Sequence, residues 1–229
     1  MSDLRIALVA EGPTDYVIIE AALKAFLPQP FILTQLQPEA TKPEIGGGWG
    51  GVLKWCSMAG ERFQGPIDQD PTLLGFDLLI IHLDVDVATF NYADCGEYLA
   101  LLAQQKGWAS LPCAQVCPPV GSTVQALQTV ITSWLGQASL GGTVLCLPAQ
   151  SSGTWLAAAL LDAAHPLLTN AECDITVESR LPLLPKKQRV KKSRLEYMRK
   201  AAELTNKWAD VKNMCSQAGQ FETAVLNTI

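Results

Sequence analysis

Short apolar runs alternate with longer amphipathic segments through the first part of the chain. The runs cover residues 4–10, 31–36, 76–83 and 142–147, and a weaker one covers 114–117. Runs of this length that end in glycine, proline or acidic residues are typical of buried strands in a parallel sheet. The pattern therefore predicts a strand at each of these positions, and the strongest of them is 76–83.

Apolar residues recur at helical spacing between these runs. We expect a first helix that Thr14 caps and that ends before Pro28, because proline cannot continue a helix. Further helices are expected over residues 52–63, 94–106, 122–135 and 154–164. Strands that alternate with helices favour right-handed crossovers and a parallel sheet. We therefore predict an α/β fold with a mainly parallel central sheet flanked by helices.

The last quarter of the chain has a different character. A polar connector leads to a proline-rich basic segment, and two more helices are expected over residues 193–209 and 217–226. We assign residues 1–165 to an α/β domain and residues 166–229 to a basic connector and helical tail. The tail is too short, and its helix faces are too apolar, for a separate domain. We expect it to pack back on the same domain.

The composition is that of a globular protein with a substantial core. Of the 229 residues, 48% are hydrophobic, which excludes a disordered or fibrous chain. No apolar run approaches the roughly 18 residues that span a bilayer, and the N-terminus lacks the pattern of a secretion signal. We therefore expect a cytoplasmic protein that has no membrane partner.

The seven cysteines are an odd number and lie scattered through apolar segments. Their spacing is not that of a zinc site, because no second cysteine or histidine pair accompanies Cys113 and Cys117. We expect them to be reduced and mostly buried thiols, as in a cytosolic protein.

Two acidic stretches follow the first and the strongest apolar runs. Glu11 and Asp15 stand in the sequence Glu-Gly-Pro-Thr-Asp, and Asp84 and Asp86 stand in Asp-Val-Asp. Ligands of doubly wound sheets gather at the carboxyl ends of the strands, and oxygen donors suit Mg²⁺ or Mn²⁺. Extended geometry would put Asp84 and Asp86 on the same side, where a cation would balance their charges. We therefore expect these four acids to hold a divalent metal.

A structural interpretation of the same acids stays open. The Asp-Val-Asp pair would then be two solvated acids of a turn, and Asp15 would be a helix-start acid favoured by the helix dipole. Glu11 fits this interpretation less well, because it precedes the helix and ends a buried strand. The Asp-Val-Asp pair also fits it less well, because it follows a run too hydrophobic for an edge strand.

The two histidines are expected to be structural. His82 stands inside the strongest apolar run, so we expect a core histidine or a support for the ligands rather than a ligand. His165 precedes a proline near the end of a predicted helix, which suggests a C-terminal cap. Neither histidine is predicted to be a metal ligand or a catalytic base.

Six of the seventeen lysines and arginines fall in one short segment, although the formal net charge is −5. They are Lys186, Lys187, Arg189, Lys191, Lys192 and Arg194. Such a cluster suits the phosphate backbone of DNA or RNA, in a contact that depends on salt and not on sequence. Lys191 or Lys192 could instead reach the metal site, and a solvated charge run is the structural alternative.

These motifs resemble the TOPRIM domain, which is shared by topoisomerases, primases, recombination proteins and the overcoming-lysogenization-defect nucleases. The resemblance covers residues 1–165, and the invariant acids of the family correspond to Glu11, Asp84 and Asp86. The acid at Asp15 and the helical tail are closer to small stand-alone bacterial members and to the nuclease group. The resemblance implies a Rossmann-like four-stranded parallel sheet, Mg²⁺ binding, and phosphodiester cleavage or transfer.

One departure from the family pattern lies after the run at 142–147. Related small proteins carry another Glu ahead of a Trp-Leu helix start, whereas this chain has Ser151, Ser152 and Gly153 before Trp155. The acid of a second metal site is therefore missing at this position. We expect the two serines to cap the following helix.

The sequence supports two functional hypotheses. In the first, the chain is a metal-dependent nuclease in which Asp84 and Asp86 hold Mg²⁺, while Glu11 completes the metal shell or acts as general base. In the second, it is a non-catalytic module that binds a nucleic acid or a nucleotide. The glycine-rich stretch 46–51 could then expose N–H groups to phosphates, or could simply be a loop covered by Trp49. A homodimer or a partner protein is left open.

Overall fold

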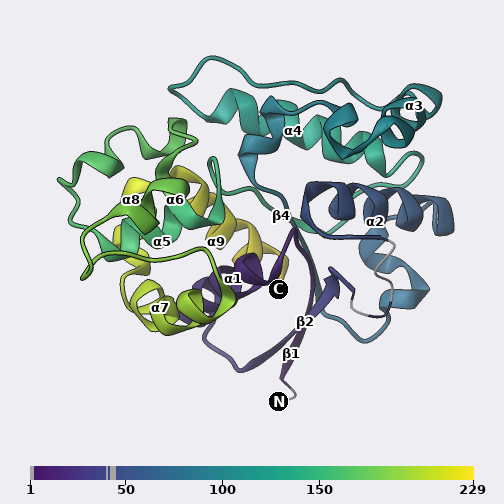
Figure 1. The fold of residues 1–229 in the computed structure, drawn as a ribbon. Coiled ribbons are helices and arrows are strands. Elements are labelled where there is room, and N and C mark those ends of the chain that lie inside the picture. Colours follow the sequence, from purple (N-terminus) through teal and green to yellow (C-terminus); the bar gives the residue numbers. More distant parts are fainter. Residues whose placement is uncertain (1–2, 40, 42–44) are drawn as a thin grey trace.

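The computed structural model describes residues 3–39, 41 and 45–229 of the chain. Within this part, four parallel strands form one sheet in the order β2-β1-β3-β4. Their bounds are β1 Leu4–Val9, β2 Phe31–Gln37, β3 Leu78–His82 and β4 Val144–Cys146. Helices flank the sheet, so the predicted α/β architecture with a parallel sheet is confirmed (Figure 1).

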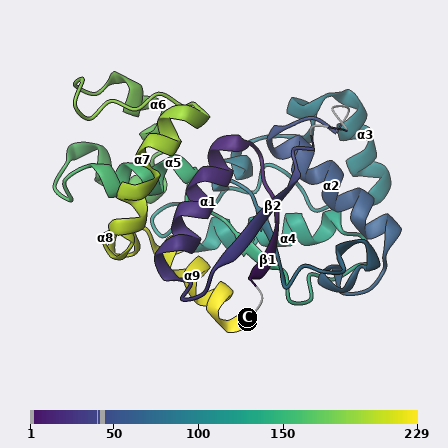
Figure 2. The same cartoon turned by 90° about the horizontal axis from the view of Figure 1, so that it is seen from below.

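Two cores lie on opposite faces of this sheet. The helices that follow its strands are α1 Pro13–Phe26, α2 Gly48–Arg62, α3 Glu97–Lys106, α4 Gly121–Trp134 and α5 Ser152–Leu160. Because successive residues of a strand face opposite sides, β1 sends Ala7 and Val9 into one core and Ile6 and Leu8 into the other. The first core packs against α2, α3 and α4, and the second packs against α1 and α5 (Figure 2).

The C-terminal part of the chain covers the second core. It contains α6 Val177–Arg180, α7 Arg194–Asn206, α8 Trp208–Met214 and α9 Ser216–Thr228. α7 packs against α1 and α5, and the Thr205 hydroxyl donates a hydrogen bond of 2.8 Å to the carbonyl oxygen of Ala21. Trp208 and Phe221 pack against the ring of Trp155 in α5. Among the described residues, no helix is both long and apolar enough to cross a bilayer.

Short 3₁₀ helices fill several connections. They are η1 Ile67–Gln69, η2 Pro71–Leu73, η3 Val85–Thr89, η4 Tyr92–Cys95, η5 Pro166–Leu168, η6 Ala171–Cys173 and η7 Leu181–Leu183. Gly96, with a φ of 104°, separates η4 from α3 and so divides the helix predicted over 94–106. The helix predicted over 193–209 is divided at Lys207. His165 caps the start of η5 rather than a helix C-terminus, because its Nδ1 accepts the N–H of Leu167 at 3.2 Å.

Glycines shift the start of two helices from the predicted position. α1 begins one residue before Thr14, and its N-cap is Gly12 and not Thr14. α2 begins at Gly48, four residues earlier than predicted. A Cβ on Gly51 would lie 2.6 Å from the carbonyl oxygen of Gly46, so the first turn of α2 requires glycine at this position.

The segment 114–117 is not a strand, contrary to the prediction. The N–H of Gln115 donates a hydrogen bond of 2.9 Å to Thr123 Oγ1 at the start of α4, and not to a neighbouring strand. Prolines flank the segment on both sides and offer no N–H to a sheet. The segment is instead part of the loop that leads into α4.

A disulfide corrects the prediction that the cysteines are reduced. Cys117, in the loop before α4, is bonded to Cys173 of η6, with 5.6 Å between their Cα atoms. The free cysteines are Cys56, Cys146 and Cys215, which are buried, and Cys95 and Cys113, which are half-buried. The sequence could not indicate this pair, because the two cysteines are 56 residues apart and only the fold brings their loops together.

Candidate metal centre

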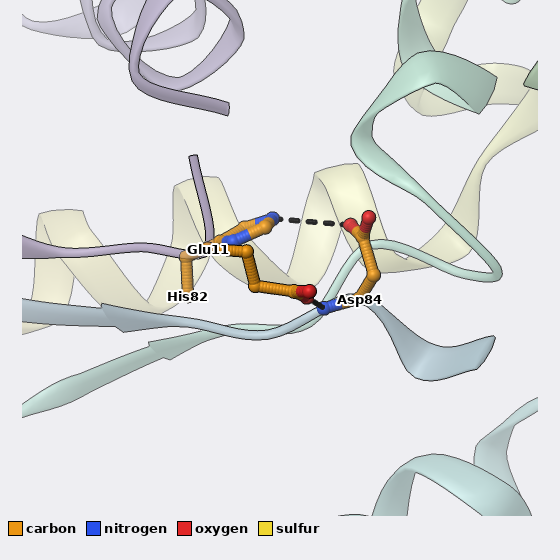
Figure 3. A group of neighbouring side chains, drawn as sticks. All are labelled: Glu11, His82 and Asp84. Carbon is orange, nitrogen blue, oxygen red and sulfur yellow. Dashed lines mark hydrogen bonds and ion pairs between the residues drawn. The ribbon is translucent and has the colours of Figure 1, made fainter. Parts of the chain in front are cut away.

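Glu11 and Asp84 meet at the carboxyl edge of the sheet. β1 and β3 are adjacent parallel strands, so the residues that follow them leave the sheet side by side. The backbone N–H of Asp84 donates a hydrogen bond of 2.7 Å to Glu11 Oε1 (Figure 3). Two of the predicted metal ligands are therefore in contact.

His82 is the third side chain at this point. It ends β3, and its side chain is fully buried, with 0% exposure. Its Nε2 lies 3.2 Å from Asp84 Oδ1, and one donor atom from each of Glu11, His82 and Asp84 lies within 4.8 Å of the others. Figure 3 shows the imidazole and the Glu11 carboxylate both pointing toward Asp84. We call these three residues the acid–histidine cluster; the sequence predicts His82 as a core residue or a support for the ligands and not as one of the donors.

The first turn of α5 fixes two acids at once. The N–H of Ser152 donates a hydrogen bond of 2.8 Å to Asp84 Oδ1, and its hydroxyl donates one of 2.7 Å to Asp15 Oδ1. The prediction that the two serines cap α5 is confirmed for Ser151 alone, which occupies the N-cap position. Ser151 is the N-cap but makes no side-chain cap bond, and the Ser152 hydroxyl ties α5 to Asp15 of α1.

Asp86 lies beside the acid–histidine cluster rather than in it. The 3₁₀ helix η3 begins directly after Asp84, so the extended geometry predicted for Asp-Val-Asp ends there. The N–H of Asp86 donates a hydrogen bond of 3.1 Å to the carbonyl oxygen of Gln150, and the side chain is partly exposed. Its charge still acts on Asp84, which makes Asp86 a close neighbour of the cluster.

Burial and like charges raise the pKa values of three acids here. Burial raises the pKa of Glu11 well above its ordinary value, and the charge of Asp84 adds to the shift. Burial also raises the pKa of Asp84 well above its ordinary value, with further contributions from Asp15 and Asp86. The pKa of Asp86 rises to about 6, chiefly through burial, while the charge of Lys192 opposes the rise. Carboxylates in such surroundings gain from a nearby cation.

Glu178 of α6 lies against the start of α5 at Gly153. A Cβ on Gly153 would collide with the side chain of Glu178, so glycine leaves the room that this acid occupies. The carboxylate of Glu178 accepts hydrogen bonds from Lys192 Nζ at 2.6 Å and from the Tyr197 hydroxyl at 2.5 Å. The charges of Glu178 and Lys192 both act on the two aspartates of Asp-Val-Asp. Residues 151–156 contain no acid, and the carboxylate beside the start of α5 is instead that of Glu178, from a later part of the chain.

The basic segment lies between η7 and the first turn of α7. Its six cations are all exposed: Lys186, Lys187, Arg189, Lys191, Lys192 and Arg194. Within the described part of the chain, Lys192 is the member of this set that forms a salt bridge, and its partner is Glu178. Of the two lysines considered for the metal site, Lys192 therefore approaches the acids, while Lys191 is turned to solvent without an ion pair among the described residues.

The glycine-rich stretch borders the cluster through its backbone. The N–H of Gly48 donates a hydrogen bond of 2.8 Å to the carbonyl oxygen of Glu11, so α2 begins next to the end of β1. Trp49 is buried, and its ring lies 6.4 Å from that of Phe90 and 6.5 Å from that of Trp134. Close packing of α2 accounts for both the glycines and the tryptophan.

Comparison of the chain with models of known protein families, with curated proteins and with solved structures finds no match. The donor atoms of the site determine what it can bind. Two carboxylates and an imidazole within 4.8 Å of one another are donors that a divalent cation accepts. The buried ring nitrogens of His82 have no hydrogen-bond partner among the described residues, which also fits a cation at this place.

Proposed function

We propose that this chain is a nuclease that depends on a divalent metal and cleaves or transfers phosphodiester bonds of DNA or RNA on a TOPRIM-type fold. The observation that carries the proposal is the contact between Glu11 and Asp84 at the ends of two adjacent parallel strands. Glu11 and Asp84 would hold Mg²⁺ or Mn²⁺, with Asp86 and Asp15 as neighbouring acids. The resemblance of the two acidic motifs to those of the TOPRIM family supports the same function.

The surroundings of Glu11 and Asp84 suit them to this chemistry. When bound, the cation supplies positive charge to the buried carboxylates and stabilises charge that develops on a phosphate oxygen. Backbone N–H groups already hold one oxygen of each acid, since Glu11 Oε1 accepts from Asp84 and Asp84 Oδ1 accepts from Ser152. These bonds orient both side chains before substrate arrives.

Lys192 is the basic residue nearest to the acids in this proposal. Glu178 holds its ammonium group, and Tyr197 holds the other oxygen of Glu178. From this position Lys192 stabilises negative charge on a bound phosphate. The exposed cations of the basic segment contact the nucleic-acid backbone further away, in a sequence-independent manner.

Cleavage by the purified chain tests the proposal. We expect single- or double-stranded DNA or RNA to be cut with Mg²⁺ or Mn²⁺, and not after the metal is chelated. Asp84→Asn should lower the cleavage rate at least about 100-fold, because an amide is a poor ligand and leaves charge at the phosphate unbalanced. Asp210→Asn, at an exposed position of α8, is the control and should leave the rate unchanged. No cleavage of any substrate, or equal cleavage by Asp84→Asn, would contradict the proposal.

A second candidate function is binding without cleavage, which one observation favours. Gly153 offers no carboxylate of its own, and the Glu178 carboxylate beside it is already paired with Lys192. The basic segment would then bind a nucleic acid or a nucleotide without turnover. Fluorescence anisotropy with a labelled oligonucleotide separates the two functions: binding that persists in Glu11→Gln and Asp84→Asn, with no product formed, favours the second.

A further inference from the structure

His82 is unusual for a buried histidine because its ring lacks hydrogen bonds to the described residues. Its side chain has 0% exposure, and neither ring nitrogen has a hydrogen-bond partner among the described residues. Buried polar groups are nearly always paired, because an unpaired one costs the free energy of its lost hydration. The other histidine shows the ordinary solution, since Nδ1 of His165 accepts the N–H of Leu167. The Asp84 carboxylate, 3.2 Å from Nε2, is an ion-pair contact without a hydrogen bond, and Nδ1 has no hydrogen-bond partner among the described residues.

The position of the His82 ring matches a metal ligand. Its Nε2 is 3.2 Å from Asp84 Oδ1, yet these two atoms do not form a well-directed hydrogen bond. Two donors on neighbouring positions of an octahedral ion, each about 2.1 Å from it, lie about 3.0 Å apart. The separation of Nε2 and Oδ1 is therefore that of two ligands of one ion. A Glu11 oxygen lies within 4.8 Å of both, which places the third donor within reach of the same ion.

We propose that His82 Nε2 is a direct metal ligand with Glu11 and Asp84, and that the site therefore prefers a transition-metal ion such as Mn²⁺ to Mg²⁺. Imidazole nitrogen suits first-row transition metals, whereas Mg²⁺ takes oxygen donors and binds few protein ligands. A neutral imidazole adds no charge, so the cation balances the two buried carboxylates. This set differs from the three carboxylates that the family resemblance implies. The inference rests on the cation of the proposed function, and not on cleavage.

Pulsed EPR spectroscopy of the Mn²⁺-loaded chain tests this ligand directly. The chain has two histidines, so tag-free protein in a buffer without imidazole limits any imidazole nitrogen coupling to His82 or His165. We expect the coupling in the wild type and in His165→Gln, and its loss in His82→Gln. Labelling the histidines with ¹⁵N should convert the signal to that of ¹⁵N. If His82→Gln does not fold, the coupling in His165→Gln still identifies His82.

Competition calorimetry gives a second readout. We expect Mn²⁺ to bind at least about tenfold more tightly than Mg²⁺, and His82→Gln to lose at least about tenfold in Mn²⁺ affinity. Cys146→Ala is the control for burial, because Cys146 is the β4 partner of His82 in the sheet and lies outside the acid–histidine cluster. It should retain the preference for Mn²⁺.

The outcomes separate this inference from the proposed function. Mn²⁺ binding without nitrogen coupling, or coupling that persists in His82→Gln, would overturn the inference and leave a site of oxygen ligands. Nitrogen coupling in a chain that cleaves no nucleic acid would support the inference and overturn the nuclease proposal. If the chain binds neither Mn²⁺ nor Mg²⁺, both the His82 ligand and the metal dependence of the proposed function are overturned.

Discussion

Backbone groups, more than side chains, hold Asp84 in place. Its N–H donates to Glu11, and its carboxylate accepts the N–H of Ser152 at the start of α5. The Ser152 hydroxyl adds a bond to Asp15, so one serine connects both acidic stretches. A cation that binds between Glu11 and Asp84 would therefore meet side chains that are already oriented.

Ser152→Ala tests this connection. The substitution removes the hydroxyl donor of Asp15, which is 3% exposed, so the free energy of unfolding should fall by about 1–3 kcal/mol. Ser151→Ala is the matched control, because Ser151 makes no side-chain cap bond, and its effect should stay below about 0.5 kcal/mol. Urea unfolding measures both variants. Equal losses would show that the Ser152 hydroxyl has no special role.

At the level of residues, the sequence predicts those parts of the site that follow the strand pattern. Glu11 and Asp84 could be predicted to meet because each follows an apolar run, and parallel strands bring their carboxyl ends to one edge. His82 could be predicted only as a core residue or a support for the ligands, because a polar residue inside an apolar run gives no sign of which atoms its ring contacts. Glu178 could not be predicted either, since α6 packs on α5 only in the folded chain.

The contact of α6 with α5 depends on the missing side chain of Gly153. Glu178 occupies that space and is held there by Lys192 and Tyr197. The two elements therefore fit together through one glycine, although glycine is a poor helix former. The packing of α6 against α5, and not the helix propensity of α5, therefore explains the glycine at position 153.

Gly153→Ala should lower the free energy of unfolding by about 1–3 kcal/mol, because the new methyl group collides with Glu178. Gly219→Ala is the matched control within α9, where a Cβ would meet nothing within 4 Å. That variant should gain about 0.5–1 kcal/mol through the higher helix propensity of alanine. Thermal and urea unfolding measure the change in the free energy of unfolding for both variants. A gain in both variants would contradict the packing described for Glu178.

At the level of elements, the order of strands and helices could be predicted, while several boundaries could not. Periodicity identifies the buried strands, because apolar runs of this kind need cover on both faces. The start of α2 at Gly48 depends on the close approach of Gly51 to the carbonyl oxygen of Gly46. Residues 114–117 do not form the predicted strand, because the N–H of Gln115 bonds to Thr123 of α4. The bond between Cys117 and Cys173 depends on two loops that meet only in the folded chain.

In the whole molecule, the C-terminal part of the chain lies beside the candidate metal centre. It shares the second core with the sheet, and it brings Glu178 and Lys192 to the acids at the sheet edge. The change of composition after residue 165 suggests a tail packed on the domain, but periodicity cannot indicate which of its side chains reach the site. A net charge of −5 also conceals that a basic segment lies beside an acidic site.

Metal titration by calorimetry tests most directly whether Glu11 and Asp84 hold one divalent cation. We predict that the metal-free chain binds one Mn²⁺, and that Glu11→Gln and Asp84→Asn each weaken binding at least about tenfold, whereas Asp210→Asn does not. Protons compete for the carboxylates of Glu11 and Asp84, whose pKa values burial raises well above the ordinary range, so affinity should fall as the pH is lowered. A wild-type chain that binds no cation, or binding that both substitutions leave unchanged, would contradict a metal centre at this edge of the sheet.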